Sequence, residues 1–198
     1  MVRREELLAI AARQIGELGF DRASFRGIAE DAGVSYGTVQ HHFPTKQELW
    51  SALVAEVLVP MYPRSRPAAP DASGEVDAEL TERVRQRIEG AVLRPGLSAA
   101  ILMDRSEGAE VRLRQLAEAL APVRAIELQT LRMLQASGHL REVDEGALMA
   151  VLGVALSSLS SAKPAIRILL GIDMDDPAVR DRLARGITDL LLRGLLPR

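Results

Sequence analysis

Few residues of this 198-residue chain have types and spacings suited to catalysis. The run Gly33-Val34-Ser35-Tyr36-Gly37 matches the G-x-S-x-G turn that exposes a nucleophilic serine in α/β-hydrolases. That turn requires a buried strand before it, whereas residues 25–32 (FRGIAEDA) have the amphipathic pattern of a helix. We therefore expect Ser35 to begin a helix, and we expect no catalytic residue and no enzyme activity.

The histidines do not have the spacing of a metal site. His41 and His42 are adjacent, so their rings point to different sides of a helix, and His139 follows Gly138 near a helix end. The chain has no cysteine, hence no thiolate ligand and no disulfide. The acidic pair before Pro177 is explained by Asp176 as a helix N-cap. We expect no metal and no cofactor.

The segment around residues 35–42 is better suited to contacting DNA. This segment and residues 25–32 are each about two helical turns long and meet at Gly33-Val34, as in a helix-turn-helix, whose second helix enters the major groove. Val34, Val39 and Phe43 would face inward. The outward positions hold polar or small groups that can approach base edges and phosphates, namely Tyr36, Gly37, Gln40 and His41.

The elements that must position these residues are all predicted to be helical. Ser24, Ser35 and Thr45 are predicted N-caps, Thr45 as part of a capping box with Glu48. Gly19 and Gly33 are predicted to end the first two helices, and Pro60 the fourth. Further helices are predicted near 77–93, 97–104, 109–137, 144–161 and 177–195, with a kink or break at Pro122.

Composition indicates a folded, non-membrane protein built in two parts. Hydrophobic residues make up 47% and charged residues 26%, which excludes a disordered chain. The longest apolar run, 147–156, is too short for the roughly 20 residues that cross a bilayer, and the N-terminus lacks a secretion signal, so we expect a cytoplasmic protein. Net charge is −2, but residues 32–47 contain no acid.

Aromatic residues and prolines mark the expected boundaries. No aromatic residue follows Tyr62, and residues 60–74 are rich in proline. We expect a helix-turn-helix domain with its connecting helix over residues 1–59, a flexible linker over 60–76 and a second helical domain over 77–198.

Residues 24–50, SFRGIAEDAGVSYGTVQHHFPTKQELW, resemble the DNA-binding domain of the TetR family of transcriptional regulators. The IAEDAGVS turn, the G-T-V recognition helix and HHF-P-x-K carry the resemblance, and residues 171–198 resemble the last helix of many members. The resemblance implies a three-helix DNA-binding domain followed by a helical bundle for effector binding and dimerisation.

The resemblance also implies which residues meet DNA. Positions that contact bases or phosphates in the family are occupied by Ser35, Tyr36, Gly37, Thr38, Gln40 and His41. Arg26 and Lys46 match positions that grip phosphate, and His42 matches one that braces the helix as much as it contacts DNA. Gln40 and His41 stand where aromatic residues are common, although Gln can address adenine with two hydrogen bonds.

The last two predicted helices have long apolar faces, which suit either an intramolecular core or a partner. These faces comprise Leu148, Leu152, Ala155 and Leu159, and Leu183, Ile187, Leu190, Leu191 and Leu195. The resemblance implies that they form a four-helix bundle in a homodimer. It also implies an effector cavity within 77–137, for which we expect a lining of Leu, Ile, Val, Met103 and Met133. Without aromatic residues, this cavity favours an aliphatic, acyl or small neutral effector.

These observations predict a repressor that binds a palindromic operator in double-stranded DNA and is released by a small-molecule effector. Effector binding would shift the helix over 48–59, and Trp50 would report the shift by fluorescence. Two alternatives stay open. One is an activator or constitutive DNA-binding regulator without an effector. The other is a helical ligand-binding or interaction module that no longer binds DNA, which Gln40 and His41 would favour.

Overall fold

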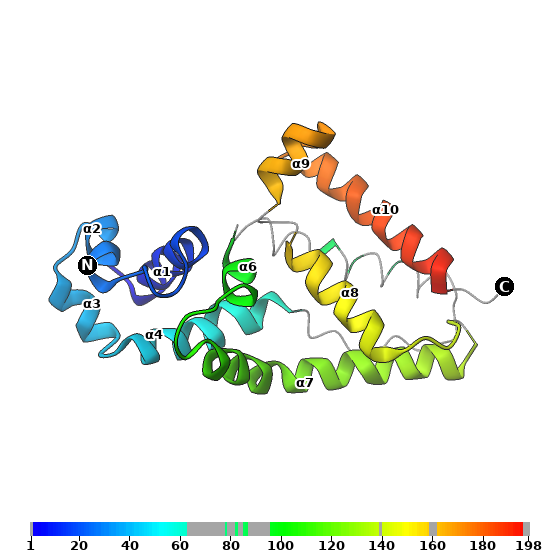
Figure 1. The fold of residues 1–198 in the computed structure, drawn as a ribbon, viewed down its shortest axis with the longest axis horizontal. Helices are drawn as coiled ribbons and strands as arrows, with labels where there is room; N and C mark the ends of the chain where they lie inside the picture. The colour runs from blue at the N-terminus through cyan, green and yellow to red at the C-terminus, as the bar shows by residue number, and fades with distance from the viewer. Residues whose placement is uncertain are drawn as a thin grey trace. The chain divides into compact units, whose positions relative to one another are not determined.

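The computed structural model describes residues 2–62, 96–138, 140–158 and 162–195, together with residues 78, 82, 85 and 86. For residues 61, 98, 99, 152–158 and 191–195 it describes the backbone alone. Within the described ranges every regular element is helical, which confirms the all-α prediction (Figure 1). The chain divides into two compact units, Met1–Met61 with Arg94–Leu120, and Tyr62–Leu93 with Ala121–Arg198.

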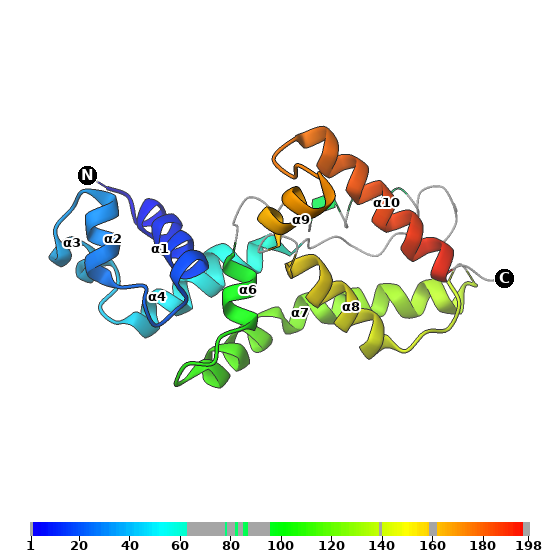
Figure 2. The same ribbon diagram turned by 45° about the horizontal axis from the view of Figure 1, so that its top comes forward.

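The first unit begins with four short helices, here called the head (Figures 1 and 2). They are α1 (Arg4–Leu18), α2 (Phe25–Ala32), α3 (Tyr36–His42) and α4 (Lys46–Leu53). Each apolar helix face turns to a shared core, whose fully buried members include Leu7, Ile15, Ile28, Val39, Phe43 and Trp50. The head therefore holds most of the chain's aromatic residues around a core of its own.

Hydroxyl side chains fix where three of these helices begin. The hydroxyl of Ser24 accepts a hydrogen bond from the Gly27 N–H at 3.1 Å. Ser35 accepts from Thr38 at 3.2 Å. Thr45 accepts from the Glu48 N–H at 3.1 Å. All three predicted N-caps are confirmed, and each satisfies an N–H that has no partner within its own helix.

Two glycines end the first helices as predicted. Gly19 (φ 84°) follows α1, and Gly33 (φ 65°) takes the left-handed conformation after α2, where a side chain would be strained. The predicted stop at Pro60 is confirmed to within one residue, because α4 continues through a π-helical turn (Val54–Leu58) and a 3₁₀ turn (Val59–Met61) and helical structure ends at Met61. A proline fits there because the first residues of a helical turn need no internal N–H donor.

The head is joined in its compact unit by α6 (Leu97–Leu102) and by the start of α7 (Ala109–Ala136). The backbones of α1 and α6 approach closely, since a Cβ atom built on Gly96 would lie 2.4 Å from the Gly16 carbonyl oxygen. We expected a second domain over 77–198, whereas residues 96–120 of it belong to the same compact unit as the head. Residues 63–76 of the expected linker and most of the expected helix 77–93 lie outside the described residues.

Helix α7 is continuous across Pro122, so a break at that position is excluded. The proline has no N–H to donate to the carbonyl four residues earlier, and a local kink is the form of the prediction that remains. α7 belongs to both compact units, because the division falls between Leu120 and Ala121.

The second unit contains the end of α7 with α8 (Glu145–Ser158), α9 (Lys163–Leu170) and α10 (Pro177–Leu195). A small core joins α7 to α8 through Leu131, Leu134 and Leu140, with Val143 and Leu148 packed against it. The Asp176 carboxylate accepts from the Ala178 N–H at 2.8 Å, which confirms the predicted start of α10. Helix α9 was not among the predicted helices. No described helix is long and apolar enough to cross a membrane.

Candidate nucleic-acid interface

Helix α3 presents one polar face to solvent and one apolar face to the core. Tyr36 is 47% exposed, and Ser35, Gly37, Gln40 and His41 are also exposed. On the other face Val39 and Phe43 are fully buried and Val34 is half-buried. The structure therefore places outward the four residues that the helical pattern placed outward.

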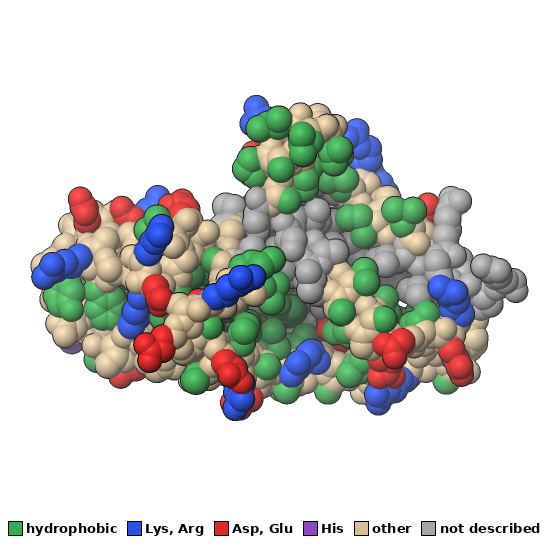
Figure 3. All heavy atoms as spheres, in the orientation of Figure 1, with side chains coloured by type: hydrophobic (Ala, Val, Ile, Leu, Met, Phe, Trp, Pro, Cys, Tyr) green, Lys and Arg blue, Asp and Glu red, His purple; other side chains and the backbone are tan. Residues whose placement is uncertain are grey.

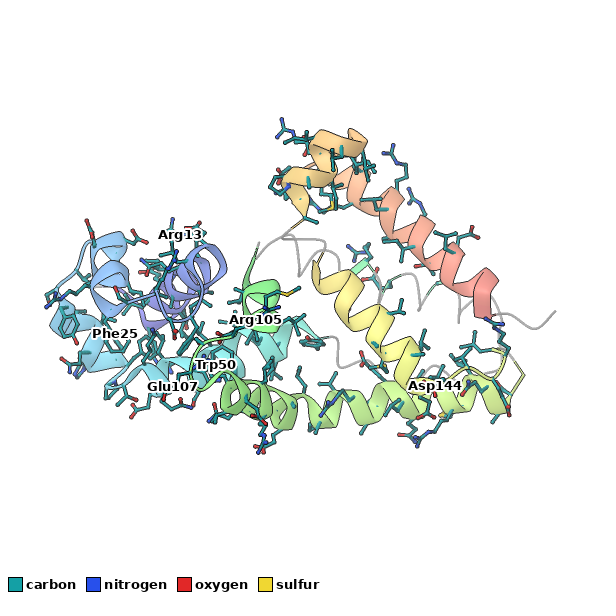
Figure 4. The ribbon with its side chains drawn as sticks, viewed as in Figure 1. Arg13, Phe25, Trp50, Arg105, Glu107 and Asp144 are labelled. Atoms are coloured by element: carbon teal, nitrogen blue, oxygen red, sulfur yellow. The ribbon has the colours of Figure 1, made fainter. Side chains whose placement is uncertain are left out.

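The start of α3 is built by its own hydroxyls and by α2. The Ser35 and Thr38 hydroxyl oxygens lie 2.9 Å apart, so both side chains help to hold the first turn. The Tyr36 ring lies beside the Phe25 ring of α2, with centroids 6.2 Å apart (Figure 4 labels Phe25). This contact supports the tyrosine where α2 and α3 meet while its ring stays half exposed.

The two adjacent histidines differ in their surroundings. His41 is exposed, whereas His42 is half-buried and lies between the ring of His41 (centroids 5.6 Å apart) and that of Phe43 (6.4 Å). His42 is thus placed to brace the helix end and His41 to reach outward. Among the described side chains no cluster of three potential metal ligands occurs.

The two predicted phosphate-binding cations sit at the starts of neighbouring helices. Arg26 is exposed in the first turn of α2. Lys46 is half-buried in the first turn of α4, where its ammonium donates to the Asp21 carbonyl at 3.0 Å and lies 4.6 Å from the Phe20 ring centroid. Burial lowers the pKa of Lys46, and the nearby Asp21 opposes that shift. An ammonium has three N–H donors, so Lys46 can hold Asp21 and still address a phosphate.

A further cation near α3 was missed by the sequence analysis. Arg4 in α1 forms an ion pair with Glu56 of the π-helical turn, and its guanidinium lies 5.0 Å from the centroid of the Phe43 ring. No local spacing signals this contact, because Arg4, Phe43 and Glu56 come from three different segments. Arg4 thus connects the end of α3 to α1 and to the continuation of α4.

Trp50 lies inside the head rather than on its surface. Its side chain is 1% exposed, and the Phe20 ring meets it edge-on with centroids 5.7 Å apart (Figure 4). Its indole nitrogen has no hydrogen-bond partner among the described residues. An indole in a dry apolar site is sensitive to small changes in packing, so Trp50 is a suitable fluorescence reporter.

The second unit leaves apolar side chains uncovered on α8 and α10. Residues 146–158 of α8 contain no charged side chain, Val151 is 58% exposed and Leu190 of α10 is 73% exposed. Leu148, Leu183 and Ile187 of the expected apolar faces are half-buried. The other members of these faces, Leu152, Ala155, Leu159, Leu191 and Leu195, lie outside the described side chains.

One residue of the expected effector cavity is misplaced. Met103 is 65% exposed, because α6 ends at Leu102 and Met103 lies in the turn beyond it. Met133 is half-buried on α7. The expectation that Met103 lines an enclosed cavity is therefore wrong, and Met133 remains a candidate.

The head matches a known family of DNA-binding proteins. Residues 7–53 match the model of bacterial regulatory proteins of the tetR family. The head is therefore similar to the N-terminal domain of the tetR family. The regulator RutR of Escherichia coli (strain K12) is 21% identical to it over 200 residues, which cover 99% of this chain and 92% of RutR. The repressor KstR2 of Mycobacterium tuberculosis (strain H37Rv) is 38% identical over 64 residues, 32% of either protein.

Solved structures of transcriptional regulators share this fold, with alignments that cover nearly the full length of the chain. The structure of the ketosteroid transcriptional regulator KstR2 of Mycobacterium tuberculosis covers 100% of this chain and 96% of that one, with a TM-score of 0.67 and 18% identity. The probable transcriptional regulatory protein RHA5900 gives a TM-score of 0.65 with 22% identity over 99% and 100% of the two chains. At these identities the likeness concerns the fold.

Proposed function

We propose that this protein is a homodimeric transcriptional repressor of the TetR type that reads a palindromic operator with α3. The observation that carries the proposal is the two-sided construction of α3, in which buried Val39 and Phe43 fix the helix while Tyr36, Gln40 and His41 face solvent. A recognition helix needs this arrangement, because base contacts are specific only when the helix itself cannot rotate.

Each exposed residue has a role that its chemistry suits. The Gln40 amide can accept from and donate to one adenine edge in the major groove, and the Tyr36 hydroxyl can bind a phosphate oxygen. Gly37 has no side chain, so the backbone of α3 can approach the DNA closely. Arg26 and Lys46 would bind phosphates and fix the head on the duplex, with Ser35, Thr38, His41 and His42 completing the contact surface.

The second unit would supply the dimer. Two heads must bind half-sites about one helical turn apart, roughly 34–36 Å, which requires two copies held in fixed register. The uncovered apolar side chains on α8 and α10 support self-association through these helices, since burial of such a surface is favourable. The proposal places the protein in the cytoplasm, where operator DNA is accessible.

An effector would release the repressor by favouring a spacing of the heads that no longer fits the operator. Residues 96–195 contain no aromatic side chain, which supports an aliphatic, acyl or small neutral effector over a flat cationic one. Because α4 and its π-helical continuation lead out of the head, Trp50 emission is expected to change when the effector binds.

The test is fluorescence anisotropy with labelled DNA from the region upstream of the protein's own gene, with excess competitor DNA. We expect Tyr36→Ala to weaken specific binding on the order of tenfold or more, as for loss of a good groove contact. Lys46→Ala should lose less affinity and flatten the salt dependence by about one phosphate. The control is Arg105→Ala, which removes an exposed cation outside the head helices.

The outcomes separate the candidate functions. Specific binding that Tyr36→Ala weakens and Arg105→Ala does not supports the repressor. Failure to bind any sequence selected from the genome would contradict it, and would favour the ligand-binding or interaction module to which Gln40 and His41 point. Binding that no tested compound releases would favour a constitutive regulator.

A further inference from the structure

The strongest feature outside the DNA-facing surface is a buried cluster around Arg112 in the first unit. Arg112 belongs to α7, and its side chain is only 8% exposed. Its guanidinium carbon, Cζ, lies 4.0 Å from the centroid of the ring of Phe20, a residue in the turn between α1 and α2. A cation on an aromatic face is most stabilising when it is withdrawn from water, as here.

Hydrogen bonds to the loop before α7 also hold the Arg112 guanidinium. The Arg112 Nε donates to Asp104 at 3.0 Å, and a terminal nitrogen donates to the same carboxylate oxygen at 2.6 Å. Further donations go to the Ser106 hydroxyl and to the Glu107 carbonyl at 3.2 Å. These hydrogen bonds use nearly all the N–H donors of the Arg112 guanidinium, so the guanidinium is held in a fixed position against the Phe20 ring. Figure 4 shows the loop that carries Arg105 and Glu107 immediately before α7.

Both oxygens of the Asp104 carboxylate that binds this guanidinium accept hydrogen bonds. Its second oxygen accepts from the Ser106 N–H at 3.0 Å and from the Ser106 hydroxyl at 2.6 Å. Burial would raise the pKa of Asp104, but the hydrogen bonds from Ser106 and Arg112 outweigh burial and hold the pKa below its ordinary value. Asp104 is therefore ionised at neutral pH and compensates the buried charge of Arg112.

The same phenylalanine touches the phosphate-binding lysine of the proposed interface. The Lys46 ammonium lies 4.6 Å from the Phe20 centroid and donates to the carbonyl of Asp21, the next residue. Phe20 also meets Trp50 of α4 edge-on. A second contact joins α7 to α4, since the Gln47 side chain donates to Gln115 at 2.9 Å. Phe20 is thus in contact both with α7, through Arg112, and with α4, through Lys46 and Trp50.

We propose that Arg112 is a positioning residue for DNA binding, acting through Phe20 to hold Lys46 where it meets a phosphate. The inference rests on the proposed function. Arg112 is too buried to reach DNA itself, so any effect on DNA affinity must pass through the residues it contacts. The connection consists of two steps. The Arg112 guanidinium contacts the Phe20 ring, and the Phe20 ring and the neighbouring Asp21 carbonyl contact the Lys46 ammonium.

The test is a double-mutant cycle of operator affinity with Arg112→Ala and Lys46→Ala, each over a salt series. We expect each single change to weaken binding on the order of fivefold, and the double variant to be little worse than either one, because residues in one network are not additive. Arg112→Ala should also flatten the salt dependence by about one phosphate, as Lys46→Ala does. The matched control is Arg114→Ala, which removes an exposed arginine of the same helix.

A second variant keeps the test decisive if Arg112→Ala folds poorly. Phe20→Leu retains an apolar side chain but removes the aromatic face, and we expect it to reproduce the loss of affinity and the flatter salt dependence. Circular dichroism establishes which variants are folded. Folded variants whose effects add independently, with an unchanged salt dependence, would overturn the proposal and leave Arg112 a purely structural residue.

A measurement without DNA separates this inference from the proposed function. The charge of Arg112 disfavours the Lys46 ammonium and so contributes to lowering the pKa of Lys46, after the larger contribution of burial. We expect Arg112→Ala to raise the Lys46 pKa in an NMR titration, and Arg114→Ala to leave it unchanged. A Lys46 titration that does not respond to Arg112→Ala would overturn the inference whether or not the protein binds an operator.

Discussion

The head and the second unit treat apolar side chains in opposite ways. In the head, Leu7, Phe43 and Trp50 are at most 1% exposed, and the residues left outside on α3 are mainly polar. In the second unit, large apolar side chains of α8, α9 and α10 are between 58% and 80% exposed, namely Val151, Ile168, Leu169, Leu170 and Leu190. Figure 3 shows apolar side chains gathered over α9.

The contrast indicates how the two units are stabilised. Burying a large aliphatic side chain contributes about 1.5–3 kcal/mol to stability. The head gains this free energy in its core, whereas the exposed apolar side chains of the second unit do not contribute it. Exposed apolar patches of this kind mark surfaces that another molecule covers. We therefore expect the stability of the second unit, and not that of the head, to rise with protein concentration.

The largest expected effect is on the head core. Phe43→Ala removes a fully buried ring behind α3 and should lower the free energy of unfolding by about 3–5 kcal/mol. Its counterpart Leu169→Ala, at a position 78% exposed, should change it by about 0.5 kcal/mol or less. Urea unfolding followed by Trp50 fluorescence measures the first variant, and the same unfolding followed by circular dichroism measures the second. Similar costs for the two variants would mean that the contrast between the units is not real.

The next effect concerns self-association. Leu190→Glu places a charge on the uncovered face of α10 and should weaken dimerisation on the order of 100-fold, because the carboxylate would be buried without a partner. Leu18→Glu is the matched control, since Leu18 is a half-exposed leucine of the head. Sedimentation equilibrium gives the dimer dissociation constants. A dimer that tolerates Leu190→Glu but not Leu18→Glu would mean that the interface lies on the head, and would contradict the prediction.

A smaller effect is expected from acid. The folded-state pKa of Asp104 is lowered, so its contribution to stability is complete above its ordinary pKa of 3.8 and is lost as the pH falls through the lower folded value. Asp104→Asn should lower the free energy of unfolding by about 1–3 kcal/mol near neutral pH. It should also make that free energy fall less steeply with decreasing pH below about pH 4. Glu145→Gln removes the half-buried carboxylate that pairs with the exposed Arg132, and it should change the stability below pH 4 less, because water screens that pair. An acid limb identical in wild type and Asp104→Asn would refute the assignment.

The sequence predicted the head in detail because its signals are local. A serine hydroxyl sets the start of each helix, Gly33 ends α2 and Phe43 before Pro44 ends α3, and both helices have the predicted residues 25–32 and 36–42. The start of α10 was equally well marked by Asp176 and Pro177. At the start of each of these helices the N-capping hydrogen bond joins residues two or three positions apart.

Features that depend on distant residues could not be predicted in this way. The short apolar run of α9, entered through a proline, has too few residues to show a helical period. The contact of Arg112 with Phe20 joins segments far apart in the chain, and no pattern in either segment signals it. The exposure of Met103 follows from where α6 ends, which hydrophobicity alone does not fix.

The most direct test of the central claim is selection of bound DNA from a random pool by wild type and by Gln40→Ala. If α3 reads base edges, wild type will enrich a palindrome with half-sites about one helical turn apart, and Gln40→Ala will lose the preference at one base pair of each half-site while keeping the others. The same enriched sequence from both proteins, or none from wild type, would contradict the assignment of α3 as the reading helix.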